Sequence, residues 1–394
     1  MTAWTTRRAV SLSPRSTGRL APRSAGPLVR EALTTWVATR VAVMTVAFAG
    51  LWMLGTTRAS AVPSFLSRWN QWDAQLFIAL GHYGYRGYGS HIDKHHLEAL
   101  FPGEPMALRL GYWATGSWVA GGLVISAIAG AVAVVALAKL GELETGADGA
   151  ACGRRAVLYL TLSPYAVFLA AGYSEALFLG FALPSWLAAR RGRWLAAGLL
   201  AGAAAVVRID GVFLGVALCV QWLTTDRRLT WRLAALSAPF VATFGYFAYL
   251  RAITGDWLAW SHAQAAGWSR TFTAPWRAFH ASWQAAFSPR PYSHYEWAFR
   301  AEIVAVLVGV ALTVLLVVWR RWGEATYVGL QVVGLACSAY YRSVPRATLM
   351  WFPLWLLLAR ASLRWRWVNP VYLAVAPALM AVGVLTFTSG HWLN

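Results

Sequence analysis

The sequence predicts an all-α integral membrane protein, a polytopic bundle of about eleven transmembrane helices with interfacial helices in its outer loops. The composition supports this class, because 58% of the 394 residues are hydrophobic, 12% are charged and the mean hydropathy is +0.50. A soluble domain carries roughly twice that share of charged residues. The 24 tryptophans and 15 tyrosines suit a protein with two membrane–water interfaces, where amphipathic rings settle at the depth of the headgroups.

The charge and the cysteines argue against two other classes. A formal charge of +19 could indicate a nucleic-acid partner, but that function needs basic residues on one exposed face together with stacking aromatic rings. Here the basic residues fall in short clusters between apolar runs, so no nucleic acid is expected. The three cysteines, Cys152, Cys219 and Cys337, have unrelated spacings and indicate neither a disulfide framework nor a thiolate metal site.

The chain divides into a tail and one domain. Residues 1–31 are rich in Arg, Ser and Pro and predict a disordered basic cytoplasmic tail, and residues 32–394 predict a single transmembrane domain. A secretory signal is not expected, because the first apolar run is long enough to span. Since a span needs roughly 20 apolar residues, the third and fifth candidates also suit tilted or half-buried helices. The predicted spans lie near 33–55, 118–138, 156–171, 173–189, 194–207, 211–225, 232–251, 302–319, 324–340, 345–359 and 370–388.

Basic residues between the spans predict the orientation, because Lys and Arg are retained on the cytoplasmic side of short loops. With the tail inside, every inner gap is basic. The N-terminus is therefore expected in the cytoplasm, and the C-terminus and active face outside, with outer loops at about 56–117 and 252–301. Arg40, in the first span, is interpreted as a side chain that snorkels to the inner headgroups. The inner gaps contain Lys139, Arg154 and Arg155; Arg190, Arg191 and Arg193; Arg227, Arg228 and Arg232; Arg320 and Arg321; and Arg360, Arg364 and Arg366.

The same topology gathers most polar side chains at the outer face. Nine of the fifteen acids and all eight histidines fall outside the spans or at their outer ends, so the chemistry is expected there. The acids are Asp73, Asp93, Glu98, Glu104, Glu175, Asp210, Asp256, Glu296 and Glu302, and the histidines are His82, His91, His95, His96, His262, His280, His294 and His391.

The first outer loop carries the leading candidate for a catalytic carboxylate. It reads Arg68-Trp69-Asn70-Gln71-Trp72-Asp73, and Gly81-His82-Tyr83-Gly84-Tyr85 follows. Asp73 comes soon after the first span and is flanked by tryptophans, at the depth where a lipid phosphate would lie. Spacing alone leaves two interpretations open, because such a residue can also be a solvated loop acid or a helix N-cap.

Together with later segments, this loop resembles the PIG-V-like mannosyltransferases, relatives of the enzyme that adds the second mannose during GPI-anchor assembly. The matches run in order from about 68 to 355, and Leu76-Phe77, Leu100-Phe101-Pro102, Ile209 and Asp210 depart from the family's usual residues. The later matching segments are Ser163-Pro164-Tyr165-Ala166, Ala171-Gly172-Tyr173-Ser174-Glu175-Ala176-Leu177-Phe178, Arg190-Arg191-Gly192-Arg193-Trp194, Arg208-Ile209-Asp210-Gly211, Thr254-Gly255-Asp256-Trp257-Leu258, His262-Ala263-Gln264, and Arg346 with Phe352-Pro353-Leu354.

The resemblance implies a GT-C-type inverting glycosyltransferase of GPI-anchor-like glycolipid biosynthesis, which moves a sugar, expected to be mannose, from a polyprenyl-phosphate donor to a lipid or glycan acceptor. Asp73 would be the general base for the attacking hydroxyl. Guanidinium groups pair bidentately with phosphate, so arginines would hold the leaving group, and His262 could donate a hydrogen bond instead. The expected substrate-binding residues are Trp72, His82, Tyr173, Glu175, Arg208, Asp210, His262, Gln264, Arg342 and Arg346.

Other roles stay open for several of these residues. Glu175 equally suits an acid that compensates a helix dipole, and Asp210 suits a counter-ion for Arg208. Asp256 follows a glycine and is typical of a turn. The stretch from His91 to His96 invites a metal site, but adjacent histidines around a lysine match no standard ligand geometry. We expect no metal and no cofactor, since the donor carries a single phosphate.

A flippase or transporter of a lipid-linked sugar is the alternative function. A transporter would place ionisable groups near the midplane on paired, interrupted helices of two related halves, and no such halves are found. A flippase also binds a phosphate at an interface but needs no base. Abundant Ala, Gly and Arg, without a retrieval signal, favours a bacterial inner membrane.

Overall fold

The computed structural model describes residues 26–54, 64–86, 96–144, 148–288 and 295–393, which form helices and turns without a β-strand. The helices are α1 (Gly26–Leu54), α2 (Asp73–Tyr83), α3 (Gly103–Thr115), α4 (Trp118–Glu142), α5 (Gly149–Thr161), α6 (Ser174–Arg190), α7 (Trp194–Val207) and α8 (Asp210–Thr225). They continue with α9 (Ala238–Thr254), α10 (Ala259–Trp268), α11 (Pro275–Phe287), α12 (Glu296–Val318), α13 (Trp322–Ala336), α14 (Val344–Ala347), α15 (Phe352–Arg364) and α16 (Val368–Thr388). Short 3-10 turns are η1 (Ser67–Trp69), η2 (Leu97–Ala99), η4 (Ala166–Leu169), η5 (Trp231–Ser237) and η6 (Thr348–Met350).

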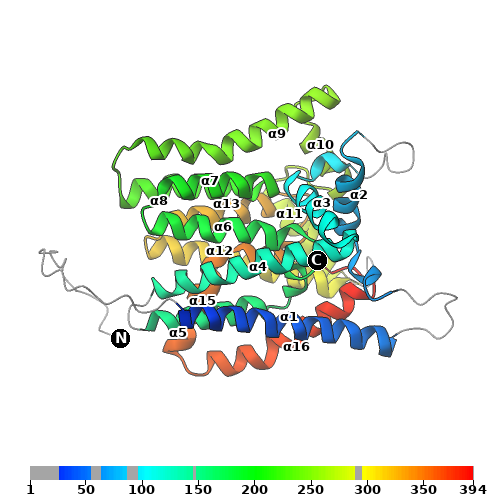
Figure 1. Ribbon diagram of the computed structural model, residues 1–394, viewed down its shortest axis with the longest axis horizontal. Helices are drawn as coiled ribbons and strands as arrows, with labels where there is room; N and C mark the ends of the chain where they lie inside the picture. The colour runs from blue at the N-terminus through cyan, green and yellow to red at the C-terminus, as the bar shows by residue number, and fades with distance from the viewer. Residues whose placement is uncertain (1–25, 55–63, 87–95, 145–147, 289–294, 394) are drawn as a thin grey trace, which may run out of the picture.

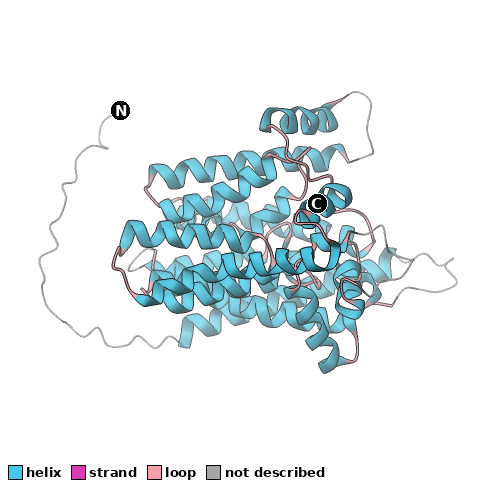
Figure 2. Ribbon diagram, turned by 90° about the horizontal axis from the view of Figure 1, so that it is seen from above, coloured by secondary structure: helices cyan, strands magenta, loops and turns pink. Residues whose placement is uncertain are grey.

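The long helices run roughly along one axis and pack side by side (Figures 1 and 2). One row follows the order α1, α4, α6, α7 and α9, and the pair α8 and α13 packs beside it. The smaller helices α2, α3 and α10 lie at one end of the bundle, at the right of Figure 1, which is called the site end below. The all-α fold class predicted from composition is confirmed.

Within the described residues, five helical segments are long and apolar enough to cross a membrane: Gly26–Met53, Trp118–Glu142, Trp231–Thr254, Glu296–Val318 and Val368–Thr388. Their outward faces expose large apolar side chains, including Val241, Leu307 and Val375, an arrangement that suits lipid and not water. The chain is therefore an integral membrane protein. Helices occupy all eleven predicted positions, but length and composition support five crossings, since α7, α8 and others are short.

Local sequence features fix the start of α4 and its close contact with α3 near the site. Ser117 caps α4, because its Oγ accepts a hydrogen bond of 3.3 Å from the amide of Ala120. Gly111 of α3 and Gly121 of α4 let two backbones touch, since a Cβ on Gly111 would come 2.8 Å from backbone atoms of Gly121. This close approach holds α3, and α2 beside it, across the site end.

Two predicted spans are interrupted instead of continuous. The span near 156–171 ends as α5 at Thr161, and Ser163-Pro164 separates it from η4. The span near 345–359 is divided into α14, η6 and α15, with Pro345 and Pro353 at the helix starts. Proline lacks the amide hydrogen that continues a helix and suits its first turn. The predicted tail is also too long, because α1 already begins at Gly26, while residues 1–25 lie outside the described residues.

Arg40 fills the first interruption, so the snorkelling interpretation was wrong. Its side chain is buried, and it donates hydrogen bonds to the carbonyl oxygens of Thr161 (2.9 Å) and Ala166 (2.8 Å). The guanidinium also lies 4.5 Å from the ring centre of Trp36. Carbonyls at an interrupted helix have no intrahelical donor, and this arginine supplies one inside the bundle.

Candidate active site

A cavity of about 450 Å³ opens at the site end, a size common for small-molecule sites. It is built from the starts of α2, α6 and α8, from α10 and the turn after it, and from the end of α13 with α14. The charged and polar residues among its walls are Asp73, Ser174, Glu175, Arg208, Asp210, Ser261, Gln264, Arg270, Thr271, Gln331, Ser338, Arg342, Ser343 and Arg346.

Asp73 begins α2, and its backbone is placed by an unusual turn. Trp72, directly before it, has φ of 52° and ψ of −122°, a conformation that costs a non-glycine residue about 1–3 kcal/mol. This turn brings Trp72 and Asp73 into the cavity wall. Oδ2 of Asp73 pairs with Nη1 of Arg346 at 3.1 Å, while Oδ1 has no hydrogen bond to any described residue. One carboxylate oxygen is therefore available to a ligand.

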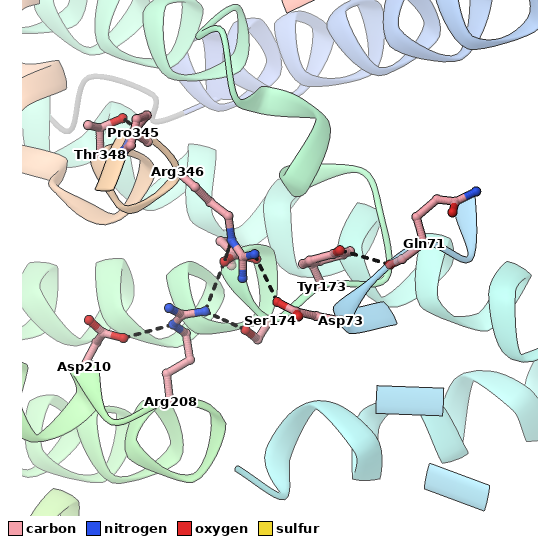
Figure 3. A network of polar contacts seen from close by, with 10 residues as sticks. Gln71, Asp73, Tyr173, Ser174, Arg208, Asp210, Pro345, Arg346 and Thr348 are labelled. Atoms are coloured by element: carbon pink, nitrogen blue, oxygen red, sulfur yellow. Dashed lines mark hydrogen bonds and ion pairs between the residues drawn. The ribbon is translucent and has the colours of Figure 1, made fainter. Parts of the chain in front are cut away.

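Glu175 is the anionic centre of the site. It lies in the first turn of α6 with 0% exposure. Its Oε1 accepts hydrogen bonds from Nε of Arg346 at 2.6 Å and from Nη1 of Arg208 at 3.0 Å. The guanidinium groups of Arg208 and Arg346, which Figure 3 shows approaching from different elements, both pair with this carboxylate. Glu175 is thus more than a helix-end acid, because it joins α6 to both arginines.

Arg208 sits in the break between α7 and α8. Its extended backbone, with φ of −152° and ψ of 152°, ends α7 and lets Asp210 start α8. Nε of Arg208 pairs with Oδ2 of Asp210 at 3.0 Å, and Nη1 donates to Oγ of Ser174 at 2.8 Å (Figure 3). The counter-ion interpretation of Asp210 is therefore confirmed, and Asp210 also lines the cavity.

Arg346 is held by stacking as well as by ion pairs. Its guanidinium lies 4.8 Å from the ring centre of Phe168 and 4.9 Å from that of Tyr173. The hydroxyl of Tyr173 donates to the carbonyl oxygen of Gln71 at 3.0 Å, which ties α6 to the turn before Asp73. The planar guanidinium suits this sandwich of two rings and two carboxylates.

A buried acid fixes the turn that carries Arg346. Glu302 of α12 accepts hydrogen bonds from the backbone amides of Ser343 (2.6 Å) and Val344 (2.8 Å). These amides begin α14, so the carboxylate acts as its cap. Ser343 itself has φ of 63°. The predicted outer acid Glu302 therefore has a positioning role, and its side chain is absent from the cavity wall.

Two further predicted residues line the cavity with weaker bonds. Nη1 of Arg342 donates to the carbonyl oxygen of Trp268 at 3.4 Å, and its guanidinium lies 5.6 Å from the ring centre of Trp392. Gln264 of α10 donates from Nε2 to the carbonyl oxygen of Ala99 at 3.1 Å. Both side chains remain partly free for a ligand, since in the described part of the chain Arg342 forms no ion pair and Oε1 of Gln264 accepts no hydrogen bond.

Two predicted substrate-binding residues do not line the cavity. His82 at the end of α2 is exposed and contacts the rings of Tyr83 and Trp118. His262 faces away from the cavity on α10 and pairs through Nδ1 with Oδ2 of Asp256 at 2.7 Å. Asp256 also accepts from the amide of Leu258, and these hydrogen bonds lower the pKa of its exposed carboxyl. This pair stabilises the start of α10 and does not reach the phosphate position expected for His262.

Arg270 is the main cavity residue that the sequence did not indicate. It follows α10, whose last turn is closed by Ser269 at φ of 54° and by the Arg270 amide on the carbonyl oxygen of Gln264. Its guanidinium has no ion pair or hydrogen bond to the described residues. Removal from water lowers the pKa of Arg270 to about 10, repulsion from Arg208 and Arg346 adds to this effect, and attraction to Asp210 and Asp73 opposes it. Among the described residues, the site thus holds a guanidinium without an ion pair beside two that are paired.

Part of the cavity lining is apolar. It is formed by Phe213 of α8 and by Val333, Gly334 and Leu335 of α13. Val333 is 59% exposed, on a surface between helices that expose apolar side chains elsewhere. The cavity lining therefore combines charged residues with an apolar part, formed by Phe213, Val333, Gly334 and Leu335.

The described residues contain no group of three His, Cys, Asp or Glu side chains that could hold a metal ion. Most of the segment from His91 to His96, considered for a metal above, lies outside the described residues.

Comparison with known proteins gives three related mammalian sequences, while no family model matches. GPI alpha-1,6-mannosyltransferase 2 of Rattus norvegicus is 34% identical over 164 residues, that of Mus musculus is 34% identical and that of Cricetulus griseus is 32% identical. Each alignment covers 38% of this chain and 31% of the relative, so the matched part is about a third of the relatives' length.

Among solved structures, ArnT from Cupriavidus metallidurans bound to undecaprenyl phosphate is 18% identical, covering 91% of this chain and 76% of that chain, with a TM-score of 0.40. The apo state of the same protein gives a TM-score of 0.37. These values are too low to define the fold. The sequence alignments confirm the resemblance found in the motifs: over the aligned residues, this chain is similar to the mammalian enzymes named GPI alpha-1,6-mannosyltransferase 2.

Proposed function

We propose that this chain is a membrane-embedded inverting glycosyltransferase, a mannosyltransferase that moves a sugar from a polyprenyl-phosphate donor to a hydroxyl of a lipid or glycan acceptor. One observation carries the proposal: Asp73, which has one carboxylate oxygen without a hydrogen bond to the described residues, lines the same cavity as Arg208, Arg270, Arg342 and Arg346. The similarity to mannosyltransferases supports the choice of sugar.

The reaction assigns one role to Asp73. The acceptor oxygen attacks the anomeric carbon and forms the new glycosidic bond, and the bond from that carbon to the phosphate oxygen breaks. The electron pair stays on the departing phosphate, and the hydroxyl proton passes to Oδ1 of Asp73. Oδ1 suits this task, because Oδ2 is already engaged by Arg346. Attack opposite the leaving phosphate inverts the anomeric centre.

The arginines suit the leaving phosphate, which gains negative charge as the bond breaks. Arg208 and Arg346 share Glu175 and have carboxylate partners, so their charges are largely balanced. Arg270 and Arg342 have none in the described chain and provide the excess positive charge. We assign the donor phosphate to Arg270 and Arg342, with Arg346 bridging the phosphate and Asp73.

The apolar part of the cavity lining suits the isoprenoid chain of the donor. Phe213, Val333 and Leu335 provide apolar surface in the same cavity as the charged residues. A donor dissolved in the bilayer would lay its chain along this apolar lining, with its phosphate at the arginines. A nucleotide-sugar donor would leave this surface unused.

The finer topology belongs to the same proposal. We place the site end at the extracytoplasmic face of a bacterial inner membrane, with the N-terminus in the cytoplasm, eleven passes of a GT-C-like domain over residues 32–394, and no metal or cofactor. The basic residues between helices support this orientation. The acceptor belongs to the class of membrane glycolipids or glycans.

A transfer assay tests the proposal. Membranes containing the protein are incubated with radiolabelled polyprenyl-phosphate-mannose, and the label is followed into acceptors. Asp73→Asn removes the proton acceptor and keeps the side chain's shape, so transfer should fall by about 10²- to 10⁴-fold while donor binding persists. The matched control is Asp148→Asn, an exposed acid outside the cavity, which should transfer normally.

Normal transfer by Asp73→Asn would remove this residue from the mechanism. Movement of the labelled donor across the membrane by the wild type, without any transfer, would instead establish the flippase alternative.

A further inference from the structure

Glu104 is a buried carboxyl that the proposed reaction does not use. It lies in the first turn of α3 with 0% exposure, and neither of its oxygens has a hydrogen-bond partner among the described residues. The helix is pressed against the end of α7, because a Cβ on Gly103 would come 2.8 Å from the carbonyl oxygen of Val206. The carboxyl is therefore confined to the protein interior. Such an unpaired buried group is rare and needs an explanation.

The neighbours of Glu104 belong to the site. Its carboxyl interacts electrostatically with Glu175 of α6 and with Arg208 at the start of α8. Glu175 also has one unsatisfied atom, since Oε1 receives both arginines while Oε2 is buried without a partner. Two interior carboxyl groups thus present three acceptor oxygens and no donor, if both are ionised.

Protonation of one of the two carboxyl groups supplies the missing hydrogen-bond donor. Burying an unpaired carboxylate is costly, and two carboxylates that share a site do not both ionise. Glu175 keeps its charge, because two arginines donate to it. Burial raises the pKa of Glu104 well above its usual range, repulsion from Glu175 raises it further, and Arg208 opposes these effects. The proton therefore belongs to Glu104.

We propose that Glu104 is a protonated carboxylic acid whose proton reaches Oε2 of Glu175 through buried water, and that it so positions the anionic centre of the site. Glu175 is then held by two arginines, from the start of α8 and from α14, and by the water that Glu104 orients. This fixes the guanidinium planes of Arg208 and Arg346 before a ligand enters. An ionised Glu104 would compete for Arg208 and add negative charge beside the phosphate position.

The protonation state is tested without any substrate. Purified wild-type protein should show the infrared carbonyl stretch of a buried, protonated carboxyl at neutral pH, and Glu104→Gln should remove that band. The control Glu98→Gln, on a partly exposed acid of η2, should leave it in place. A wild-type spectrum that is identical to that of Glu104→Gln in this region at neutral pH would overturn the proposal.

The positioning role, which rests on the proposed function, is tested by transfer. Glu104→Gln keeps a neutral donor and should retain kcat/KM near that of the wild type, while Glu104→Leu should lose about 10- to 100-fold, as expected for one hydrogen bond to a charged group. Wild-type activity should fall at alkaline pH as Glu104 ionises, and Glu104→Gln should lack this fall. Equal losses in both variants, or identical pH profiles of wild type and Glu104→Gln, would refute the role.

The two proposals fail separately. If the wild type transfers no sugar but shows the infrared band, the transferase proposal is refuted and the proposed protonation of Glu104 stands. If Glu104→Leu does not fold, the pH profiles of wild type and Glu104→Gln still decide the positioning role.

Discussion

Replacing Arg270 by glutamine should weaken the use of the donor strongly and leave the protein folded. Arg270 lines the cavity beside Arg208 and Arg346 but has no carboxylate partner in the described chain, so its charge is free for a phosphate. A hydrogen bond to a charged group contributes about 1.5–3 kcal/mol. Loss of one such bond raises the donor KM, or lowers kcat/KM, by about 10- to 150-fold.

The fold should tolerate Arg270→Gln because no buried charge is left without a partner. Removing Arg346 is different, since Glu175 at 0% exposure would lose one of its two arginine donors. Breaking a buried ion pair costs about 3–5 kcal/mol. Arg346→Gln should therefore lower the yield and the unfolding temperature, and Arg270→Gln should change neither.

The assay measures initial rates of transfer against donor concentration for wild type, Arg270→Gln and the control Arg277→Gln. Arg277 is exposed on α11, outside the cavity. A KM and kcat for Arg270→Gln equal to those of the wild type would refute the assignment of the donor phosphate. An unfolding temperature that drops as far as that of Arg346→Gln would show that Arg270 has a structural partner.

Three other predictions concern the same site and its placement. Arg346→Lys should reduce kcat/KM more than protein abundance, because a point charge cannot engage two carboxylates and two rings at once; unchanged turnover would make this arginine an anchor only. A cysteine at Thr115 should react with an impermeant maleimide on intact cells and one at Thr225 should not, and the reverse pattern would overturn the orientation. Because the pKa of Glu104 is raised in the folded protein, the unfolded chain releases this proton from about pH 4 upward while the folded chain keeps it. The unfolding temperature should therefore fall with rising pH more steeply in the wild type than in Glu104→Gln. Parallel curves for the two proteins would contradict this prediction.

Much of the fold could be predicted from apolar runs, because burial in lipid needs little more than length and hydrophobicity. α4 and α16 match their predicted spans within four residues at each end, and α12 begins six residues before its predicted span. The interruptions after Thr161 and before Phe352 were missed, although prolines stand near both. Their stability depends on distant partners, such as Arg40 on the open carbonyls, and no local pattern contains that information.

Several motif residues that were predicted to act together lie at helix starts and share one cavity in the structure. Trp72, Asp73, Glu175, Arg208 and Arg346 come from four separate segments and meet in one cavity. Side-chain direction was harder, because position in a motif does not say which face of a helix a residue occupies. His262 and Gln264 are two residues apart on α10, and only Gln264 lines the cavity.

Arg270 and Glu104 were missed as site residues for a different reason. Neither belongs to a local motif, and the role of each follows from a bond that the described residues do not supply: an ion pair for Arg270 and a hydrogen bond for Glu104. Sequence lists the charges of a loop but not which of them remain unpaired after packing.

Three of the six described non-glycine residues with positive φ stand directly before parts of the candidate site. They are Trp72, Ser269 and Ser343, and they precede Asp73, Arg270 and the turn of Arg346. Each such residue costs about 1–3 kcal/mol and persists only where its surroundings fix it. Neighbouring bonds supply that support, since Glu302 accepts from the Ser343 amide and the carbonyl oxygen of Ala265 accepts from the Ser269 amide. Three helices are thus started or ended in conformations that their sequences disfavour, and the common result is that one carboxylate and two guanidinium groups face a single cavity.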